Sequence, residues 1–169
     1  MENNRGQDIQ NQAQANEQLG TAESMKWHKF LIFFSLWLGA LLSIFNGAQL
    51  FTGMHYGSAG DARMVYLYFD GLKAIDIAMG AVAVGIAVYA IMTRFALAKY
   101  QAKGPRMLTT LYVLNLAHSL IYPLLVSVVC GMEMSEVFDS STAGSLAGSV
   151  AMIFANKNYY AKRAHLFIN

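Results

Sequence analysis

Long apolar stretches alternate with polar loops along most of this chain. Four such stretches, at 30–51, 75–92, 108–130 and 143–155, contain almost no charged residue. The first three are about as long as an α-helix must be to cross a hydrocarbon core roughly 30 Å thick, and the fourth reaches that length through the small residues around it. The pattern predicts an all-α, transmembrane four-helix bundle with spans at about 27–51, 72–93, 107–130 and 142–160.

The first residues of the chain differ from the rest in composition. Residues 1–24 are rich in Asn, Gln, Glu and Ala and offer almost no apolar surface to bury. Because such a segment cannot offset the entropy lost on folding, we expect a disordered polar tail followed by one transmembrane domain over 25–169. No A-x-A-like cleavage site follows the first span, which favours an uncleaved anchor over a signal peptide.

Basic residues are concentrated in alternate loops. They lie before the first span, between the second and third spans and after the fourth, at Lys26, Lys29, Arg94, Lys99, Lys103, Arg106, Lys157, Lys162 and Arg163. The other two loops hold only two basic residues, Arg63 and Lys73. Because short basic flanks stay on the cytoplasmic side of a membrane, we expect both termini to be cytoplasmic.

The composition agrees with a membrane protein and argues against several functions. Hydrophobic residues make up 56% of the chain and charged residues only 13%, which is typical of integral membrane proteins. The basic flanks explain the net charge of +2, and no soluble basic module with exposed aromatics suggests a nucleic-acid partner. The single cysteine, Cys130, excludes an intrachain disulfide. No group of residues has metal-ligand spacing, and no phosphate loop or nucleophile elbow is present, so we expect neither cofactor nor enzymatic activity.

Polar side chains within the spans are the candidate functional residues. Those near the outer ends of the helices form one candidate cluster: Asn46, Gln49, Asp76, Ser127 and Ser145. Its carboxylate can bind a cation or pass a proton, or Lys73 and Asp76, one turn apart, can simply satisfy each other. Asn115 and His118 form a second pair nearer the middle of the third span. This pair either hydrogen-bonds inside the bundle or takes part in a proton relay.

Small residues recur four positions apart on three of the expected helices, a spacing that lets membrane helices approach closely. The glycines singled out by these stripes are Gly39, Gly85, Gly144 and Gly148. In the simplest arrangement the stripes pack inward within one bundle. The alternative is that Gly144 and Gly148 form a dimerisation face.

Four segments carry a resemblance to a known family: WHKFLIFFSLWLGALL, FDGLKAIDIAMG, VYAIMTRFALA and NKNYYAKRAHLF. From about Met25 to its end, the chain resembles an uncharacterised family of small four-span integral membrane proteins from anaerobic Gram-positive, Clostridia-type bacteria. The resemblance implies this architecture and a location in the bacterial cytoplasmic (inner) membrane, and it carries over no site residues. Some members of that family place a zinc ribbon before the membrane portion; no cysteine precedes Cys130 here, so that module is missing.

The sequence predicts a non-enzymatic interaction, scaffold or accessory protein. Its expected partners are the lipid bilayer and either a second copy of the chain or another membrane protein, because the small-residue stripes and short loops favour helix association. The alternative is a small oligomeric transporter or ion-coupled carrier whose path is lined by Asp76, Asn46, Gln49 and His118. An intramembrane enzyme ranks third, because no paired acid and base are evident in the spans.

Overall fold

The computed structural model describes residues 25–133 and 140–168, and these residues form helices without any strand. Three helical segments are long and apolar enough to cross a membrane: Lys26–Thr52, Leu72–Ala98 and Gly104–Cys130. The all-helical class is thereby confirmed, and three of the four expected spans exist as long apolar helices. The expected disordered tail, 1–24, lies outside the described residues.

The first segment combines α2 (Lys26–Phe30), a π-helical stretch (Leu31–Ser35) and α3 (Leu36–Thr52). A π-helical stretch disturbs the regular backbone hydrogen bonds of a helix. Here Arg94 reaches across, and its Nε donates a hydrogen bond to the carbonyl oxygen of Ile32 at 3.2 Å. Its guanidinium group also lies 5.0 Å from the ring centre of Trp37. One arginine therefore ties the irregular part of the first segment to the next long helix.

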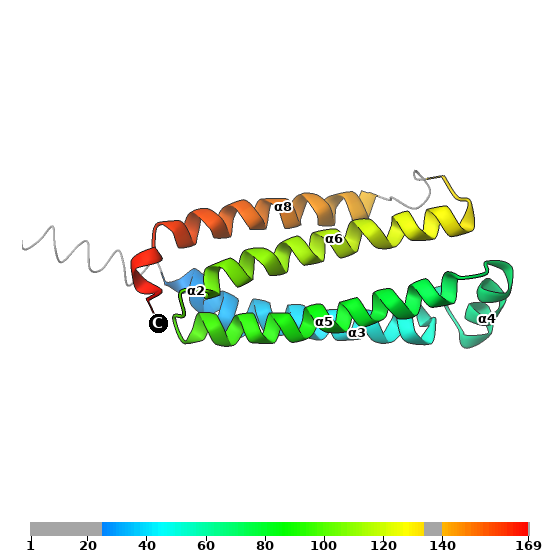
Figure 1. Ribbon diagram of the computed structural model, residues 1–169, viewed down its shortest axis with the longest axis horizontal. Helices are drawn as coiled ribbons and strands as arrows, with labels where there is room; N and C mark the ends of the chain where they lie inside the picture. Colours follow the sequence, from blue (N-terminus) through cyan, green and yellow to red (C-terminus); the bar gives the residue numbers. More distant parts are fainter. Residues whose placement is uncertain (1–24, 134–139, 169) are drawn as a thin grey trace, which may run out of the picture.

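A short helix crosses one end of the molecule. Gly53, with φ of 71°, ends α3 in the left-handed conformation that glycine adopts readily, and the 3₁₀ turn Met54–Tyr56 follows. Helix α4 (Ala59–Tyr68) then begins at Ser58, which forms a capping box with Asp61. Figure 1 shows α4 lying across the ends of the long helices, where it covers the start of the next one.

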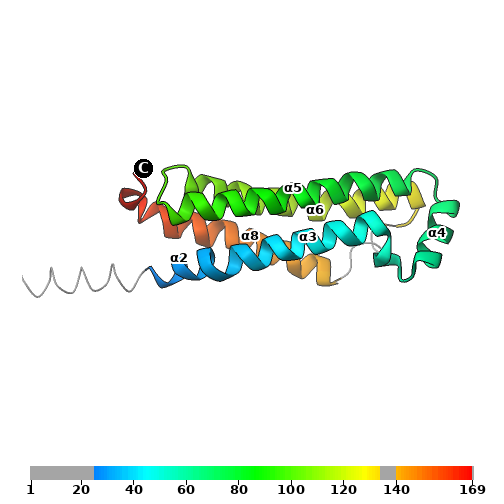
Figure 2. The same ribbon diagram turned by 90° about the horizontal axis from the view of Figure 1, so that it is seen from below.

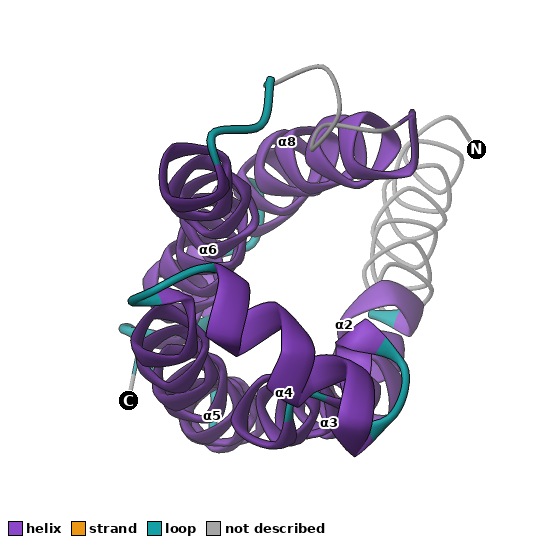
Figure 3. Ribbon diagram, turned by 90° about the vertical axis from the view of Figure 1, so that its right-hand side faces the viewer, coloured by secondary structure: helices purple, strands orange, loops and turns teal. Residues whose placement is uncertain are grey.

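The three remaining helices run up and down in chain order. They are α5 (Leu72–Ala98), α6 (Gly104–Cys130) and α8 (Ser140–Ala161), and a 3₁₀ turn, Ala164–Leu166, follows. Pro105 occupies the first turn of α6, where its missing N–H removes no helical hydrogen bond. Helix α3 packs on α5, α5 on α6 and α6 on α8. Viewed along the long axis, the helices follow one another around an arc (Figure 3).

Helices α3 and α5 approach each other most closely at two glycines. A Cβ atom at Gly47 would lie 3.0 Å from the carbonyl oxygen of Gly80, and one at Gly80 would lie 3.1 Å from that of Gly47. By contrast, a Cβ atom at the predicted packing glycines Gly39, Gly85, Gly144 and Gly148 would have no described neighbour within 4 Å. The expectation that these four pack inside the bundle is therefore corrected. The buried face of α5 carries Gly80, and Gly85 lies on its exposed face.

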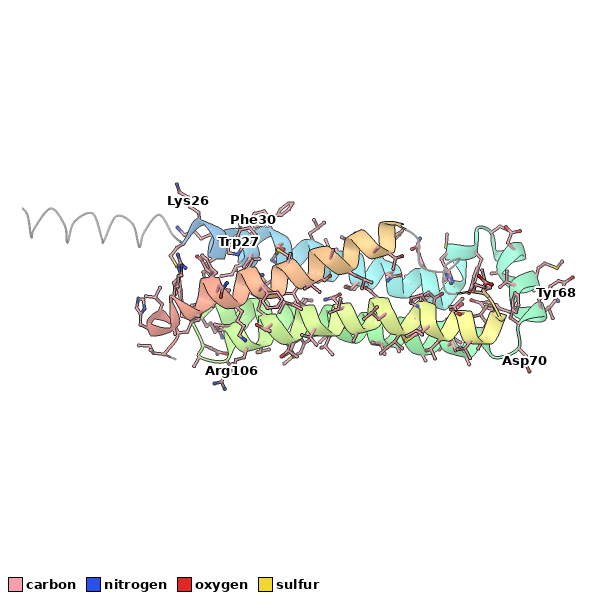
Figure 4. The ribbon with its side chains drawn as sticks, turned by 90° about the horizontal axis from the view of Figure 1, so that it is seen from above. Lys26, Trp27, Phe30, Tyr68, Asp70 and Arg106 are labelled. Carbon is pink, nitrogen blue, oxygen red and sulfur yellow. The ribbon has the colours of Figure 1, made fainter. Side chains whose placement is uncertain are left out.

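The two ends of the molecule differ in charge. We call them the α2 end, where α2 begins and α8 ends, and the α4 end (Figures 1 and 2). Every carboxylate side chain among the described residues belongs to the α4 end, namely Asp61, Asp70, Asp76 and Glu133. Figure 4 shows Lys26 and Arg106 at the α2 end and Asp70 at the other. The charge asymmetry expected from the loops is therefore present along the long axis of the fold.

Candidate functional site

A fully buried carboxylate lies at the α4 end. The Asp76 side chain is in the first turns of α5 and is 0% exposed. Tyr66 Oη donates a hydrogen bond to its Oδ2 at 2.9 Å, and Tyr122 Oη donates one to its Oδ1 at 3.0 Å. His55 Nε2 lies 3.6 Å from Oδ2. These four residues, from the 3₁₀ turn, α4, α5 and α6, are called the Asp76 cluster below.

The two ring nitrogens of His55 face different neighbours. Its Nδ1 lies 3.2 Å from the carbonyl oxygen of Gln49 in α3. Its Nε2 lies 3.1 Å from Tyr122 Oη in α6. His55 therefore joins the end of α3 to the Asp76 cluster.

Two tyrosines outside the long helices close the cluster from the α4 side. Burial and the hydrogen bond to Asp76 raise the pKa of Tyr66 to about 12. Burial also raises the pKa of Tyr56, whose ring centre lies 3.8 Å from that of His55. The Tyr56 hydroxyl is buried, and its hydrogen-bonding neighbours are Tyr122 and Asp76. Both phenols stay protonated at neutral pH, and the Asp76 carboxylate beneath them is fully buried.

The local backbone explains how Tyr66 reaches Asp76. Phe69 adopts an extended conformation after α4, and Gly71, with φ of 86°, reverses the chain before α5 begins. Left-handed backbone of this kind is readily available only to glycine. The reversal folds α4 back over the first turns of α5. The ten-residue separation of Tyr66 and Asp76 in the sequence becomes a direct contact.

The other members of the predicted outer cluster make contacts of their own. Asn46 is exposed on α3, and Gln49 takes part through its backbone carbonyl, which faces His55. Ser127 is buried, and its Oγ donates to the carbonyl oxygen of Met132 at 2.8 Å. Ser145 belongs to α8, and its side chain lies outside the described part of the structure. Of the five predicted residues, Asp76 is the one at the centre of a polar network.

Lys73 is not the partner of Asp76. Its side chain is exposed one turn away, at the start of α5. The buried carboxylate instead takes its contacts from His55, Tyr66 and Tyr122. A helix places residues three apart on neighbouring positions, but Asp76 lies beneath α4, where His55, Tyr66 and Tyr122 reach it and the exposed Lys73 does not.

Asn115 and His118, the predicted pair near the middle of the third span, contact two different partners. Asn115 Nδ2 donates to the carbonyl oxygen of Leu111 in its own helix at 2.9 Å. His118 Nε2 lies 3.2 Å from the carbonyl oxygen of Met79 in α5, so this nitrogen carries a proton. The two side chains are therefore not bonded to each other. His118 links α6 to α5, as expected of a histidine that hydrogen-bonds to a neighbouring helix.

A polar cavity lies between the long helices. It has a volume of about 270 Å³ and draws its walls from the first segment, α5, α6 and α8. The hydrogen-bonding side chains among its lining residues are Ser35, Ser43, Tyr112, Asn115, Ser119 and Ser149. We call this space the central cavity. Hydroxyl and amide groups of this kind are costly to place in hydrocarbon. Some of them are paired within the chain, since Asn115 donates to Leu111 and Tyr112 hydrogen-bonds with Ser35.

Sequence reasoning missed three members of the Asp76 cluster. His55 and Tyr66 lie outside the apolar runs, where neither depth nor helical spacing singles them out. Tyr122 carries a usable signal, because it lies one turn beyond His118 and continues the helix face that carries Asn115 and His118. Only the return of α4 over α5 shows that these tyrosines meet one carboxylate.

Comparisons with known proteins return no match for this chain, whether with family models, curated proteins or solved structures. The resemblance to small four-span proteins therefore stays a prediction. The function has to be argued from the geometry of the helices, the Asp76 cluster and the central cavity.

Proposed function

We propose that the chain is a multi-pass integral protein of a bacterial cytoplasmic membrane, with α8 as a fourth span and both termini in the cytoplasm. Three apolar helices of spanning length support a membrane location. Helix α8 lies alongside α6. With 22 residues, α8 is long enough to cross the hydrocarbon core of a membrane. Basic residues at the α2 end and carboxylates at the α4 end support a cytoplasmic α2 end, because basic flanks are retained inside.

We further propose a non-enzymatic role, in which the protein associates through its helices with a second copy of itself. The observation that carries this proposal is the central cavity, together with the lack of extensive contact between α3 and α8 among the described residues. Helix α8 packs on α6 and meets α2 only near the α2 end, where Trp27 Nε1 donates to Asn156 Oδ1 at 3.1 Å.

A second copy supplies a matching surface. Gly39 lies in the cavity wall with open space around it, and Gly144 and Gly148 are exposed on α8. In a membrane, helices associate through close backbone contact and hydrogen bonds between polar side chains, since lipid is as apolar as the helices themselves. A glycine-bearing helix from one copy fits against the cavity wall of another, where it can approach closely and meet the serine hydroxyls.

Oligomeric state measured in mild detergent tests this role. We expect a dimer or small oligomer, and Gly148→Leu should shift it toward monomer because a bulky side chain blocks close approach. Gly85→Leu is the matched control, since Gly85 is also exposed but lies on α5, away from the cavity. A protein that stays monomeric in detergent and forms no cross-linked dimer in native membranes contradicts the proposal.

An ion-coupled carrier is the second candidate, and one observation favours it. Polar side chains recur along a single face of α6 at Asn115, His118 and Tyr122, and this face leads from the central cavity to Asp76. Protonatable groups in such a row are typical of proton pathways through membrane proteins. The Asp76 cluster would then bind a proton or cation at one end of the path.

Proton flux into liposomes containing the purified protein, driven by an imposed membrane potential, tests the carrier. Asp76→Asn should abolish flux, and Asp70→Asn, a neutralisation of an exposed carboxylate at the same end, should leave it unchanged. Flux that survives Asp76→Asn removes this residue from the mechanism. Flux no higher than that of empty liposomes contradicts proton transport by the wild-type chain.

A further inference from the structure

A second and larger cavity lies at the α2 end, on the side of the molecule away from the Asp76 cluster. It occupies about 640 Å³ between the beginning of α6 and the end of α8, and Phe167 from the C-terminal turn closes one side. It is distinct from the central cavity, because the two share no lining residue. A volume of this size accommodates a small ligand or part of a larger amphiphile.

The polar part of this cavity is positively charged. Arg106 comes from the first turn of α6 and Lys157 from the last turns of α8, and both line the cavity. Figure 4 shows Arg106 at the same end as Lys26. None of the described lining residues is acidic, and the carboxylates of the described chain belong to the opposite end. The Thr110 hydroxyl adds a hydrogen-bonding group beside the two cations. An anion would be attracted here by two cationic groups that no carboxylate of the described residues is shown to pair with.

Most of the remaining lining residues are apolar. Pro105, Ile153, Phe154 and Phe167 surround the charged groups. Trp27 and Tyr159 belong to the same end of the molecule, and aromatic residues of this kind gather at the headgroup level of membranes. A small inorganic anion would gain nothing from contact with these apolar side chains. A lipid has both a charged headgroup and an apolar chain, and it matches the two parts of the cavity.

We propose that the cavity between α6 and α8 binds an anionic phospholipid of the membrane leaflet at the α2 end. The phosphate lies between Arg106 and Lys157, and the first part of an acyl chain lies along Phe154 and Ile153. This inference rests on the proposed placement of the α2 end at a membrane surface. It goes beyond the association role, since it assigns a ligand to a site that the association does not use.

Lipid retention measured by native mass spectrometry tests this site. The full chain is released from micelles that contain equal amounts of phosphatidylglycerol and phosphatidylcholine, and we expect phosphatidylglycerol to be retained preferentially. Arg106→Gln and Lys157→Gln should each lower its retention about fivefold, since one basic residue near a membrane surface contributes about 1 kcal/mol toward binding anionic lipid. Both side chains are exposed, so neither substitution disturbs the packed core.

The matched control is the double variant Lys103→Gln, Lys162→Gln, which removes the same charge from the same end outside the cavity. Equal losses in the control and in the double variant Arg106→Gln, Lys157→Gln would show only general attraction to a basic surface and overturn the proposal. Retention of both lipids alike, or displacement of phosphatidylglycerol by millimolar inorganic phosphate, also overturns it.

The same spectra report the dimer fraction. A monomer that still retains phosphatidylglycerol refutes the association role and leaves the lipid site standing, whereas a cavity variant that loses dimer instead of lipid identifies a second copy as the occupant.

Discussion

Tyr66→Phe tests whether Asp76 fastens α4 to the bundle. The substitution removes one hydroxyl and leaves the ring, so it deletes the 2.9 Å hydrogen bond to Asp76 Oδ2 and little else. A hydrogen bond to a charged group contributes about 1.5–3 kcal/mol to stability. Because Tyr66 is only partly buried, water can replace part of the lost bond. We therefore expect the free energy of unfolding to fall by about 1.5 kcal/mol, at the lower end of that range.

Chemical denaturation in detergent micelles at neutral pH, followed by circular dichroism, measures this loss. Tyr68→Phe is the matched control, because Tyr68 lies on the same helix and is 80% exposed; its effect should stay within about 0.5 kcal/mol. In an Asp76→Asn background the cost of Tyr66→Phe should shrink, since the charged acceptor is gone. Equal costs for the two tyrosines, or the same cost of Tyr66→Phe in both backgrounds, would refute the fastening role of Asp76.

Two further predictions follow from the packing and from the tyrosine hydroxyl. Gly80→Ala should lower the free energy of unfolding by about 1–3 kcal/mol, because the new Cβ lies 3.1 Å from the carbonyl oxygen of Gly47. Gly85→Ala is the control in the same denaturation assay. It should be neutral or stabilising, because its Cβ has no neighbour within 4 Å. The pKa of Tyr66 is raised from 10.0 to about 12, so its contribution to stability is complete below pH 10 and is lost as pH rises toward 12. Ultraviolet titration of phenolate in wild type and Tyr66→Phe checks this, and a Tyr66 that ionises together with the exposed tyrosines contradicts it.

The sequence identifies one residue of the candidate site, Asp76, and misses the residues that contact it. Asp76 stands out in the sequence because a carboxylate in an apolar run has to find a partner. Its position three residues after Lys73 pointed to the wrong partner, since helical spacing says nothing about a segment that folds back over the helix. His55 and Tyr66 reach the carboxylate only because Gly53 and Gly71 reverse the chain on either side of α4.

The glycine stripes show the same division for packing. The four-residue spacing occurs on α3 and α5, which do approach closely, and Gly47 lies two such intervals after Gly39 on α3. It does not say which face of α5 turns toward that stripe, and the structure selects Gly80 in place of Gly85. A helix can rotate about its axis at little cost in an apolar solvent, so the choice of face depends on all neighbours together.

Composition and hydrophobic periodicity were enough to predict the helical class, three long apolar helices and the concentration of basic residues at one end. These features depend on composition and local periodicity, which act within a few residues along the chain. The tertiary structure alone decided that four elements surround Asp76, that hydroxyl groups of several helices share the central cavity and that Arg106 and Lys157 line one site. Each of these contacts joins residues from different helices, and it forms only when the helices pack together in their final rotation and order.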